Sequence, residues 1–330
     1  MKRFATLALV MMLAVLMSVS VADAAAKYRI KIHSVGSDTH PSTPALHEFK
    51  KFVEEKSNGQ IEVGLHINAA LGGDREAIEA MQLGTVEAGI VGTSIIATFE
   101  PKFNIFEFPF LFKNHEIATR FLDGEYGEML NKELQKQDVR IIGYGVNGFR
   151  NISNNRGPIH KPEDLNGLKI RTMENPIHIA TFKLMGANPT PMNFGELYTA
   201  LSQKTVDAQE NPINLTYTSK FYEVQKFYSL TGHLYAVAPL AMSEIFFKRL
   251  PDDLKEVVLE GGRLYTKIER ANTIDEENNM LTELKAKGMQ INELSDEEKD
   301  VFKKATEPVY KEFESRVGKE LLEAALKVNQ

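Results

Sequence analysis

Residues 28–67, YRIKIHSVGSDTHPSTPALHEFKKFVEEKSNGQIEVGLHI, decide the fold class. Apolar and polar side chains alternate over the first five residues, which predicts a strand, and a run of turn-forming residues follows. Apolar residues at helical spacing, including Leu46, Phe49 and Val53, then predict a helix. A second alternating segment, 60–67, predicts another strand.

The same order of strand, loop, helix and strand recurs along the chain. A helix is predicted over residues 74–83, and further strands over 86–91, 139–146, 168–172 and 206–208. Strands that alternate with helices are typical of an α/β protein with largely parallel sheets.

Helical periodicity continues almost without interruption over residues 251–288, and Gly261-Gly262 within it predicts a kink. This helix exceeds the usual length in globular proteins, so we expect it to span two lobes. A domain boundary is predicted near Gly148, where a glycine lets the backbone turn without steric cost. One or two further amphipathic helices are predicted over 295–329.

The start of the chain differs from the rest. A basic start, an apolar run over residues 4–17 and an Ala-Asp-Ala sequence ending at Ala24 predict a secretory signal over residues 1–24, cleaved near Ala24. A membrane anchor is the weaker interpretation, because the apolar run falls short of the roughly 20 residues that cross a bilayer. The mature protein is therefore expected in the periplasm.

Composition excludes several classes of protein. The roughly 300 remaining residues suffice for two domains. A cysteine count of 0 excludes a disulfide framework and cysteine nucleophiles. The formal net charge of -6, with no basic tract outside the signal, argues against a nucleic-acid partner. The histidines show no close metal-ligand spacing, so we expect neither a metal nor a cofactor.

Common catalytic motifs are absent from the sequence. It contains no G-x-S-x-G, no H-E-x-x-H and no Walker-type loop. The glycine-rich segment 71–74 lacks dinucleotide-binding spacing, and it predicts a tight turn with Asp74 as a helix cap. A periplasmic enzyme that uses Glu196 or Glu210 as acid or base stays an alternative, although no partner carboxylate has a defined geometry.

Four polar or aromatic residues are candidates for an anion site. Arg171 closes a predicted strand and Arg150 lies in a segment rich in Gly and Asn, so either guanidinium can offer a planar fork to a carboxylate. Phe194 precedes a helix and can stack on a ligand, and Asn211 is held extended by the proline after it. The alternatives are surface or ion-paired arginines, a core Phe194 and a turn residue at Asn211.

Five groups of motifs, in order along the mature chain, make the sequence similar to a known family. They are LGGDRE (71–76) with QLG (82–84), GFR (148–150), PEDLNGLKIR (162–171), FGELYTAL (194–201) and DAQENP (207–212). The chain thereby resembles the extracytoplasmic solute-binding proteins of tripartite ATP-independent periplasmic (TRAP) transporters.

The resemblance implies an α/β, type II-like periplasmic binding protein with two lobes around a cleft and a long helix that spans both. The first lobe would comprise 27–148 plus 237–279, and the second 149–236 plus 280–330. After the signal is removed, the lobes would close over the ligand, which strengthens ion pairs by excluding water.

The resemblance also assigns roles to individual residues. Arg171 would pair with the ligand carboxylate, Arg150 would support it, Asn211 would complete its shell and Phe194 would lie beside the ligand. Weaker assignments fall on five further residues: Arg75, Asn147, His40, Thr93 and Glu210.

A non-enzymatic receptor that hands a small organic acid to TRAP permease subunits is the function this resemblance implies. Additional polar contacts favour a sugar acid such as a uronate or aldonate, and a C4-dicarboxylate or another small monocarboxylate is the alternative. A binding protein for an ATP-driven importer or for a chemoreceptor is also built from two lobes around a cleft. The order of the motifs favours the TRAP family over these alternatives. Since nothing suggests a self-complementary apolar face, we expect a monomer.

Overall fold

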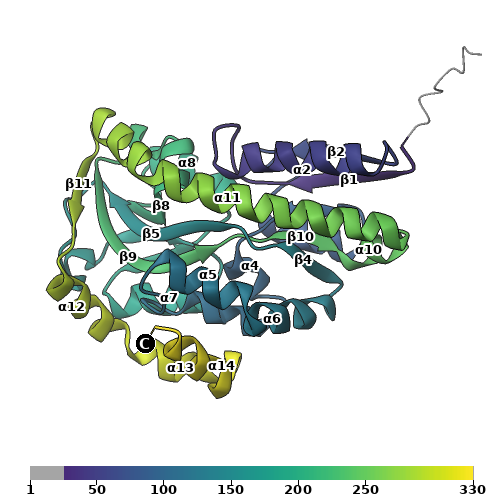
Figure 1. Ribbon diagram of the computed structural model, residues 1–330. Coiled ribbons are helices and arrows are strands. Elements are labelled where there is room, and N and C mark those ends of the chain that lie inside the picture. Colours follow the sequence, from purple (N-terminus) through teal and green to yellow (C-terminus); the bar gives the residue numbers. More distant parts are fainter. Residues whose placement is uncertain (1–25, 330) are drawn as a thin grey trace, which may run out of the picture.

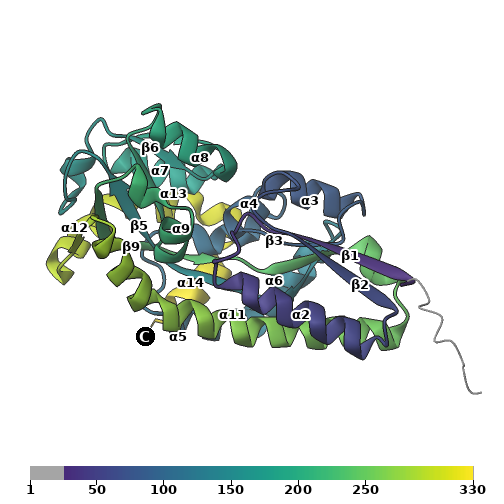
Figure 2. The same cartoon turned by 90° about the horizontal axis from the view of Figure 1, so that it is seen from above.

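Two mixed β-sheets lie side by side, each covered by helices, in the computed structural model, which describes residues 26–329 (Figure 1). Figure 2 shows them as two bodies, referred to below as the first lobe and the second lobe. The two-lobed α/β architecture expected from the sequence is confirmed. The predicted signal over residues 1–24 lies outside the described residues.

The first lobe is built on a five-stranded sheet in the order β2-β1-β3-β10-β4. Its strands are β1 (Tyr28–His33), β2 (Ile61–His66), β3 (Ala88–Ile90), β4 (Val139–Gly143) and β10 (Leu240–Ser243). β1 pairs in parallel with β2 and β3, as the opening stretch of sequence predicts. β10 runs antiparallel to both of its neighbours.

The second lobe contains a six-stranded sheet in the order β11-β9-β5-β8-β6-β7. Its strands are β5 (Val146–Asn154), β6 (Lys169–Thr172), β7 (Asn188–Pro191), β8 (Ala208–Pro212), β9 (Phe227–Val237) and β11 (Gln290–Glu293). β5 is antiparallel to β8 and β9, whereas the other pairs are parallel. The sheets are less uniformly parallel than expected because β5, β9 and β10 carry the chain between the lobes.

The predicted strand 139–146 is two strands. The chain leaves the first sheet after Gly143 and enters the second at Val146, a few residues before the boundary expected near Gly148. An added Cβ on Gly145 would lie 2.8 Å from the carbonyl oxygen of Ala238, in the returning connection. The connection from β4 to β5 and the connection from β9 to β10 therefore pass so close to each other that only a glycine fits at position 145 without displacing its neighbours.

The helices mostly follow the sequence periodicity. The α-helices are α2 (Ser42–Lys56), α3 (Asp74–Gln82), α4 (Thr93–Ile96), α5 (His115–Asp123), α6 (Glu125–Gln135), α7 (Pro176–Leu184), α8 (Phe194–Ser202), α9 (Ile213–Thr218), α10 (Glu244–Arg249), α11 (Asp252–Ala286), α12 (Asp296–Thr306), α13 (Pro308–Val317) and α14 (Lys319–Lys327), and the 3-10 turns are η1 (Pro101–Glu107), η2 (Pro162–Leu165) and η3 (Phe221–Glu223). Within residues 26–329, no helix combines the length and the apolar character needed to cross a membrane.

The cap of α3 differs from the prediction. Gly73, not Asp74, is the N-cap residue, and Asp74 is the first residue of the helix. The Asp74 carboxylate turns away from its own helix, because Oδ2 accepts a hydrogen bond from the backbone N–H of Gly92 at 2.9 Å.

The 35-residue helix α11 contacts both lobes, as its length predicted (Figure 2). It packs on α2 and β4 in the first lobe and continues along α9 of the second. The expected weak spot or kink at Gly261-Gly262 does not interrupt the helix, which is continuous from Asp252 to Ala286. The glycines instead allow close packing: an added Cβ on Gly262 would lie 1.9 Å from the carbonyl oxygen of Ile142.

Three helices, rather than one or two, form the C-terminal tail, and together they contact both lobes. α12 contacts α7 in the second lobe. Val309 and Phe313 of α13 join the cluster that holds Phe106 and Ile141 of the first lobe. α13 also contacts α7, and the same cluster contains Ile177 of the second lobe, so α13 packs against both lobes and the expected assignment of 280–330 to the second lobe stays a prediction.

The close approach of α11 to β4 can be tested with Gly262→Ala. The new methyl meets backbone rather than a flexible side chain, so we expect a loss of about 1–3 kcal/mol in the free energy of unfolding. Urea denaturation measures this loss. Asp275→Ala at an exposed position of α11 is the control, expected to change stability by less than about 0.5 kcal/mol. Equal stabilities of the two variants would contradict the packing role.

A buried carboxyl at the crossing predicts a pH effect. Glu269 of α11 accepts hydrogen bonds from Val146 N–H and the Thr273 hydroxyl, yet burial raises the pKa of Glu269 to about 8. The folded state therefore retains a proton that the unfolded state has lost, and stability falls as pH rises from the ordinary glutamate pKa toward 8.

Glu269→Gln should remove this dependence, because the neutral amide does not ionise. We expect thermal denaturation to show a flatter pH profile between pH 4.5 and 8 for Glu269→Gln than for the wild type, and a higher Tm above pH 8. The exposed Glu276→Gln on the same helix should keep the wild-type profile. A Glu269→Gln profile parallel to that of the wild type would refute the explanation.

Candidate ligand pocket

A pocket between the two lobes holds most of the residues that the sequence singled out. It encloses about 620 Å³ of space, part of it open to solvent. Arg150, Arg171, Phe194 and Asn211 line it from the second lobe. From the first lobe the lining includes three polar residues at or just before helix starts: His40, Asp74 and Thr93.

Arg171 lies on β6 and is 2% exposed. Its Nε and Nη2 both donate to the carbonyl oxygen of Met192, at 2.9 and 2.7 Å, which fixes the plane of the guanidinium. Nη1 is buried and has no hydrogen-bond partner among the described residues. Burial lowers the pKa of Arg171 to about 10, so the group stays charged at neutral pH. An unsatisfied buried cationic donor at a pocket is a site for an anion.

Phe194 and Asn211 flank this position. The centroid of the Phe194 ring is 5.9 Å from the guanidinium carbon of Arg171, and Phe194 begins α8 after an Asn193 cap. The amide of Asn211 donates to Gln209, and its oxygen accepts from Arg150 at 3.2 Å. One amide N–H of Asn211 therefore remains for a ligand oxygen.

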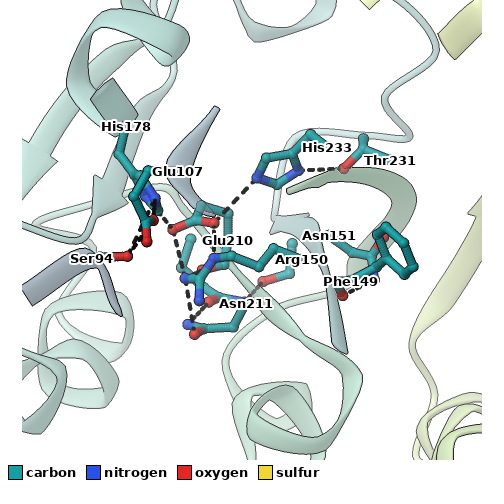
Figure 3. A network of polar contacts seen from close by, with 12 residues as sticks. Ser94, Glu107, Phe149, Arg150, Asn151, His178, Glu210, Asn211, Thr231 and His233 are labelled. Carbon is teal, nitrogen blue, oxygen red and sulfur yellow. Dashed lines mark hydrogen bonds and ion pairs between the residues drawn. The ribbon is translucent and has the colours of Figure 1, made fainter. Parts of the chain in front are cut away.

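Arg150 is held by a carboxylate behind it. Both Nε and Nη2 donate to the carboxylate of Glu210, and Nη2 also donates to the Glu210 backbone carbonyl at 2.7 Å (Figure 3). Glu210 is fully buried and is not among the pocket-lining residues. In this position Glu210 orients Arg150, and its predicted ligand contact stays a prediction.

Two buried histidines also reach Glu210. Nε2 of His233 lies 3.2 Å from Oε2, and Nδ1 of His178 lies 3.7 Å from Oε1. Burial alone would raise the pKa of Glu210, but the charge of Arg150 and the two histidine contacts hold it well below the usual range. Glu210 is therefore ionised, and Arg150 is charge-compensated before any ligand arrives.

The network continues into the first lobe through a glutamate that the sequence analysis did not select. Nε2 of His178 lies 2.7 Å from Oε2 of Glu107, and the hydroxyls of Ser94 and Thr93 also donate to Glu107 (Figure 3). Burial lowers the pKa of His178, but the hydrogen bond to Glu107 and the negative charge of Glu210 outweigh it and leave the pKa raised. The available signal was a charged residue inside an otherwise apolar, aromatic run.

The remaining predicted residues differ in position. His40, Thr93 and Asn147 line the pocket. Arg75 does not; its Nε donates to Glu174 at 3.0 Å, forming a partly exposed ion pair between the lobes beside the pocket. Within residues 26–329, no group of three or more His, Asp and Glu side chains is arranged to hold a metal ion.

Two lobes joined by crossing strands, with a pocket between them that presents a fixed and unsatisfied arginine, define a solute-binding protein. The model of the DctP family, described as bacterial extracellular solute-binding protein, family 7, matches residues 32–316. The chain belongs to this family, whose members are extracytoplasmic subunits that work with TRAP permeases. The resemblance identified in the sequence is thereby confirmed.

Individual relatives match most of the chain. A solute-binding protein from Verminephrobacter eiseniae is 38% identical over 303 residues, 92% of this chain and 90% of the relative. The structure of a TRAP periplasmic solute-binding protein from Polaromonas sp. JS666, bound to D-erythronate, has a TM-score of 0.89 at 37% identity and covers 92% of this chain and 99% of that one. A relative from Sulfurospirillum deleyianum with bound succinate has a TM-score of 0.88 at 34% identity, with coverages of 92% and 99%.

The buried pair can be tested with Glu210→Ala. This change leaves Arg150 buried without its counter-charge, so we expect a loss of about 3–5 kcal/mol in the free energy of unfolding, measured by denaturant titration. Glu62→Ala breaks the exposed Arg29–Glu62 pair and should cost less than about 1 kcal/mol. A Glu210→Ala protein as stable as Glu62→Ala would show that the pair does not support the fold.

Proposed function

We propose that this chain is a periplasmic receptor that captures a small organic acid, a sugar acid such as an aldonate or uronate, and delivers it to a TRAP permease. The observation that carries the proposal is the buried Nη1 of Arg171, unpaired within residues 26–329, on a residue that lines the pocket and whose guanidinium is already fixed by Met192. A ligand carboxylate satisfies this donor and removes the cost of leaving it unpaired.

Other groups complete the proposed carboxylate site. Arg150 supplies its remaining N–H group, since Nε and Nη2 are engaged by Glu210. Asn211 supplies an amide N–H, and the ring of Phe194 packs against the carbon chain of the acid. Asn147, His40 and Thr93 contact the rest of the ligand, whereas Arg75 acts at the edge through its pair with Glu174.

The lobe geometry supports capture by closure. We propose a first lobe of 27–148 plus 237–279 and a second of 149–236 plus 280–330. The pair Arg75–Glu174 joins the lobes beside the pocket. After removal of a signal over residues 1–24, the receptor acts as a monomer, which is supported by the scatter of its exposed apolar residues, such as Leu83 and Val301, over different elements.

We also propose that the chain is not an enzyme. Ser94, His178 and Glu107 include the residue types of a hydrolytic triad. However, the contacts among their side chains differ from those of a triad, in which the histidine lies between the serine and the carboxylate. The Ser94 hydroxyl donates to Glu107, and the same Nε2 of His178 that stands 3.5 Å from Ser94 is engaged by Glu107. No free base is therefore placed to take the serine proton, unlike in a working triad.

A C4-dicarboxylate is the second candidate ligand class. The relative from Sulfurospirillum deleyianum holds succinate and is 34% identical over nearly the whole chain. The same Arg171 site serves either class, so the choice depends on the opposite wall of the pocket.

The proposed function is tested by a thermal-shift screen of aldonates, uronates and dicarboxylates with the mature chain. An acid at roughly 100 times its Kd should stabilise the protein by about 2.7 kcal/mol. Arg171→Ala should lower the affinity for that acid at least about 100-fold in calorimetric titration, and Arg171→Lys about tenfold, because an ammonium lacks the planar fork. Arg316→Ala removes an exposed arginine and should bind normally. Unchanged affinity in folded Arg171→Ala would refute the assignment.

A further inference from the structure

The two walls of the pocket offer different chemistry. The second-lobe wall presents hydrogen-bond donors from Arg150, Arg171 and Asn211. The residues that line the pocket from the first lobe include Asp74 and His40, together with serine and threonine residues such as Thr93. A ligand that spans the pocket therefore needs an acceptor-only end and an end that can both donate and accept.

Asp74 is positioned as a fixed acceptor. Oδ2 accepts from Gly92 N–H at 2.9 Å, and Oδ1 lies 3.4 Å from Nε2 of the fully buried His33. Each oxygen of a carboxylate has two lone pairs, so one further hydrogen bond at each oxygen is open to a ligand. These contacts hold the carboxylate in the pocket wall without neutralising it by an arginine or lysine.

His40 is positioned as a fixed donor. Its Nδ1 accepts from the backbone N–H of Ser42 at 3.3 Å and lies 2.7 Å from the Ser42 hydroxyl, which assigns the proton to Nε2. Nε2 is buried and has no hydrogen-bond partner in the part of the chain that the structure describes. Burial lowers the pKa of His40 to about 4, so the ring is a neutral donor at the pH of the periplasm.

The distribution of charge completes the argument. The cations that line the pocket, Arg150 and Arg171, both belong to the second lobe, and Arg150 is already paired with Glu210. A second carboxylate, directed toward the first lobe, would meet the negative charge of Asp74 and no lining cation. A hydroxyl in the same place can donate to Asp74 and accept from His40.

We propose that Asp74 and His40 form a hydroxyl-recognising subsite that makes the pocket selective for hydroxylated monocarboxylates and excludes dicarboxylates. This inference rests on the proposed function, because it takes the ligand carboxylate to be bound at Arg171. It assigns Asp74 a role in ligand selection, in addition to its place in the first turn of α3.

D-Erythronate and succinate make a matched pair for the test, since both have four carbons. Erythronate carries one carboxylate and several hydroxyls, whereas succinate carries two carboxylates and no hydroxyl. In calorimetric titrations of the wild-type mature chain, we expect erythronate to bind at least about tenfold tighter than succinate. Asp74→Asn should weaken erythronate binding about 10- to 100-fold and should not weaken succinate binding, so the preference narrows by at least tenfold. Glu79→Gln, exposed on the same helix, is the control and should keep the wild-type ratio.

His40→Phe supplies an independent variant, because it removes the Nε2–H donor while keeping a ring of similar size. It should weaken erythronate about tenfold and leave succinate unchanged, with a circular dichroism melt to confirm folding. Succinate binding tighter than erythronate in the wild type, or an unchanged ratio in both folded variants, overturns the subsite and leaves the proposed function intact. Failure of every acid to bind the wild type overturns both proposals, whereas loss of acid binding in folded Arg171→Ala alone supports the carboxylate site at Arg171.

Discussion

The compensation of buried charge around Glu210 is the interaction on which the site depends. A fully buried carboxylate accepts both arms of Arg150, and His178 and His233 approach it from other elements. Burying one such charge alone is strongly unfavourable, whereas a hydrogen-bonded set is tolerated and rigid. Because Arg150 is paired with Glu210 in this way, Arg171 is the pocket-lining arginine that has no directly paired carboxylate among the described residues, which supports the proposal of a ligand with one carboxylate at this point.

Much of the fold could be predicted because its elements are encoded locally. The alternation in residues 28–67 gave β1, α2 and β2, and the length of the periodic segment after Pro251 gave a helix that contacts both lobes. What failed depended on contacts between distant segments. In the sequence, Gly261-Gly262 suggests a weak spot or kink. In the structure, the backbone of Ile142 lies against Gly262, a contact that the sequence does not show. The packing of α13 on the first lobe has the same origin.

The candidate site was predictable to the extent that motifs mark it. Arg171 stands at a strand end, and Arg150 and Asn211 belong to recognisable segments, so sequence reasoning brought them together. The contact of Glu210 with Arg150 was not predicted, because the sequence does not show that this carboxylate is fully buried. Glu107 and His178 were missed because their contact spans 71 positions in the sequence, and the one local signal, a charged residue within an aromatic run, does not show which residue Glu107 contacts.

The chain passes between the lobes at several separate places: from β4 to β5, from β9 to β10, along α11, and from α12 to α13. A body tethered at one point can swivel in any direction, but several tethers leave few relative motions that stretch none of them. Bending of one lobe toward the other, about an axis through these connections, then requires the least energy, whereas twisting and sliding of the lobes are restricted. If the lobes close on the ligand as proposed, these connections restrict the search for the closed arrangement and reduce the entropy lost on closing.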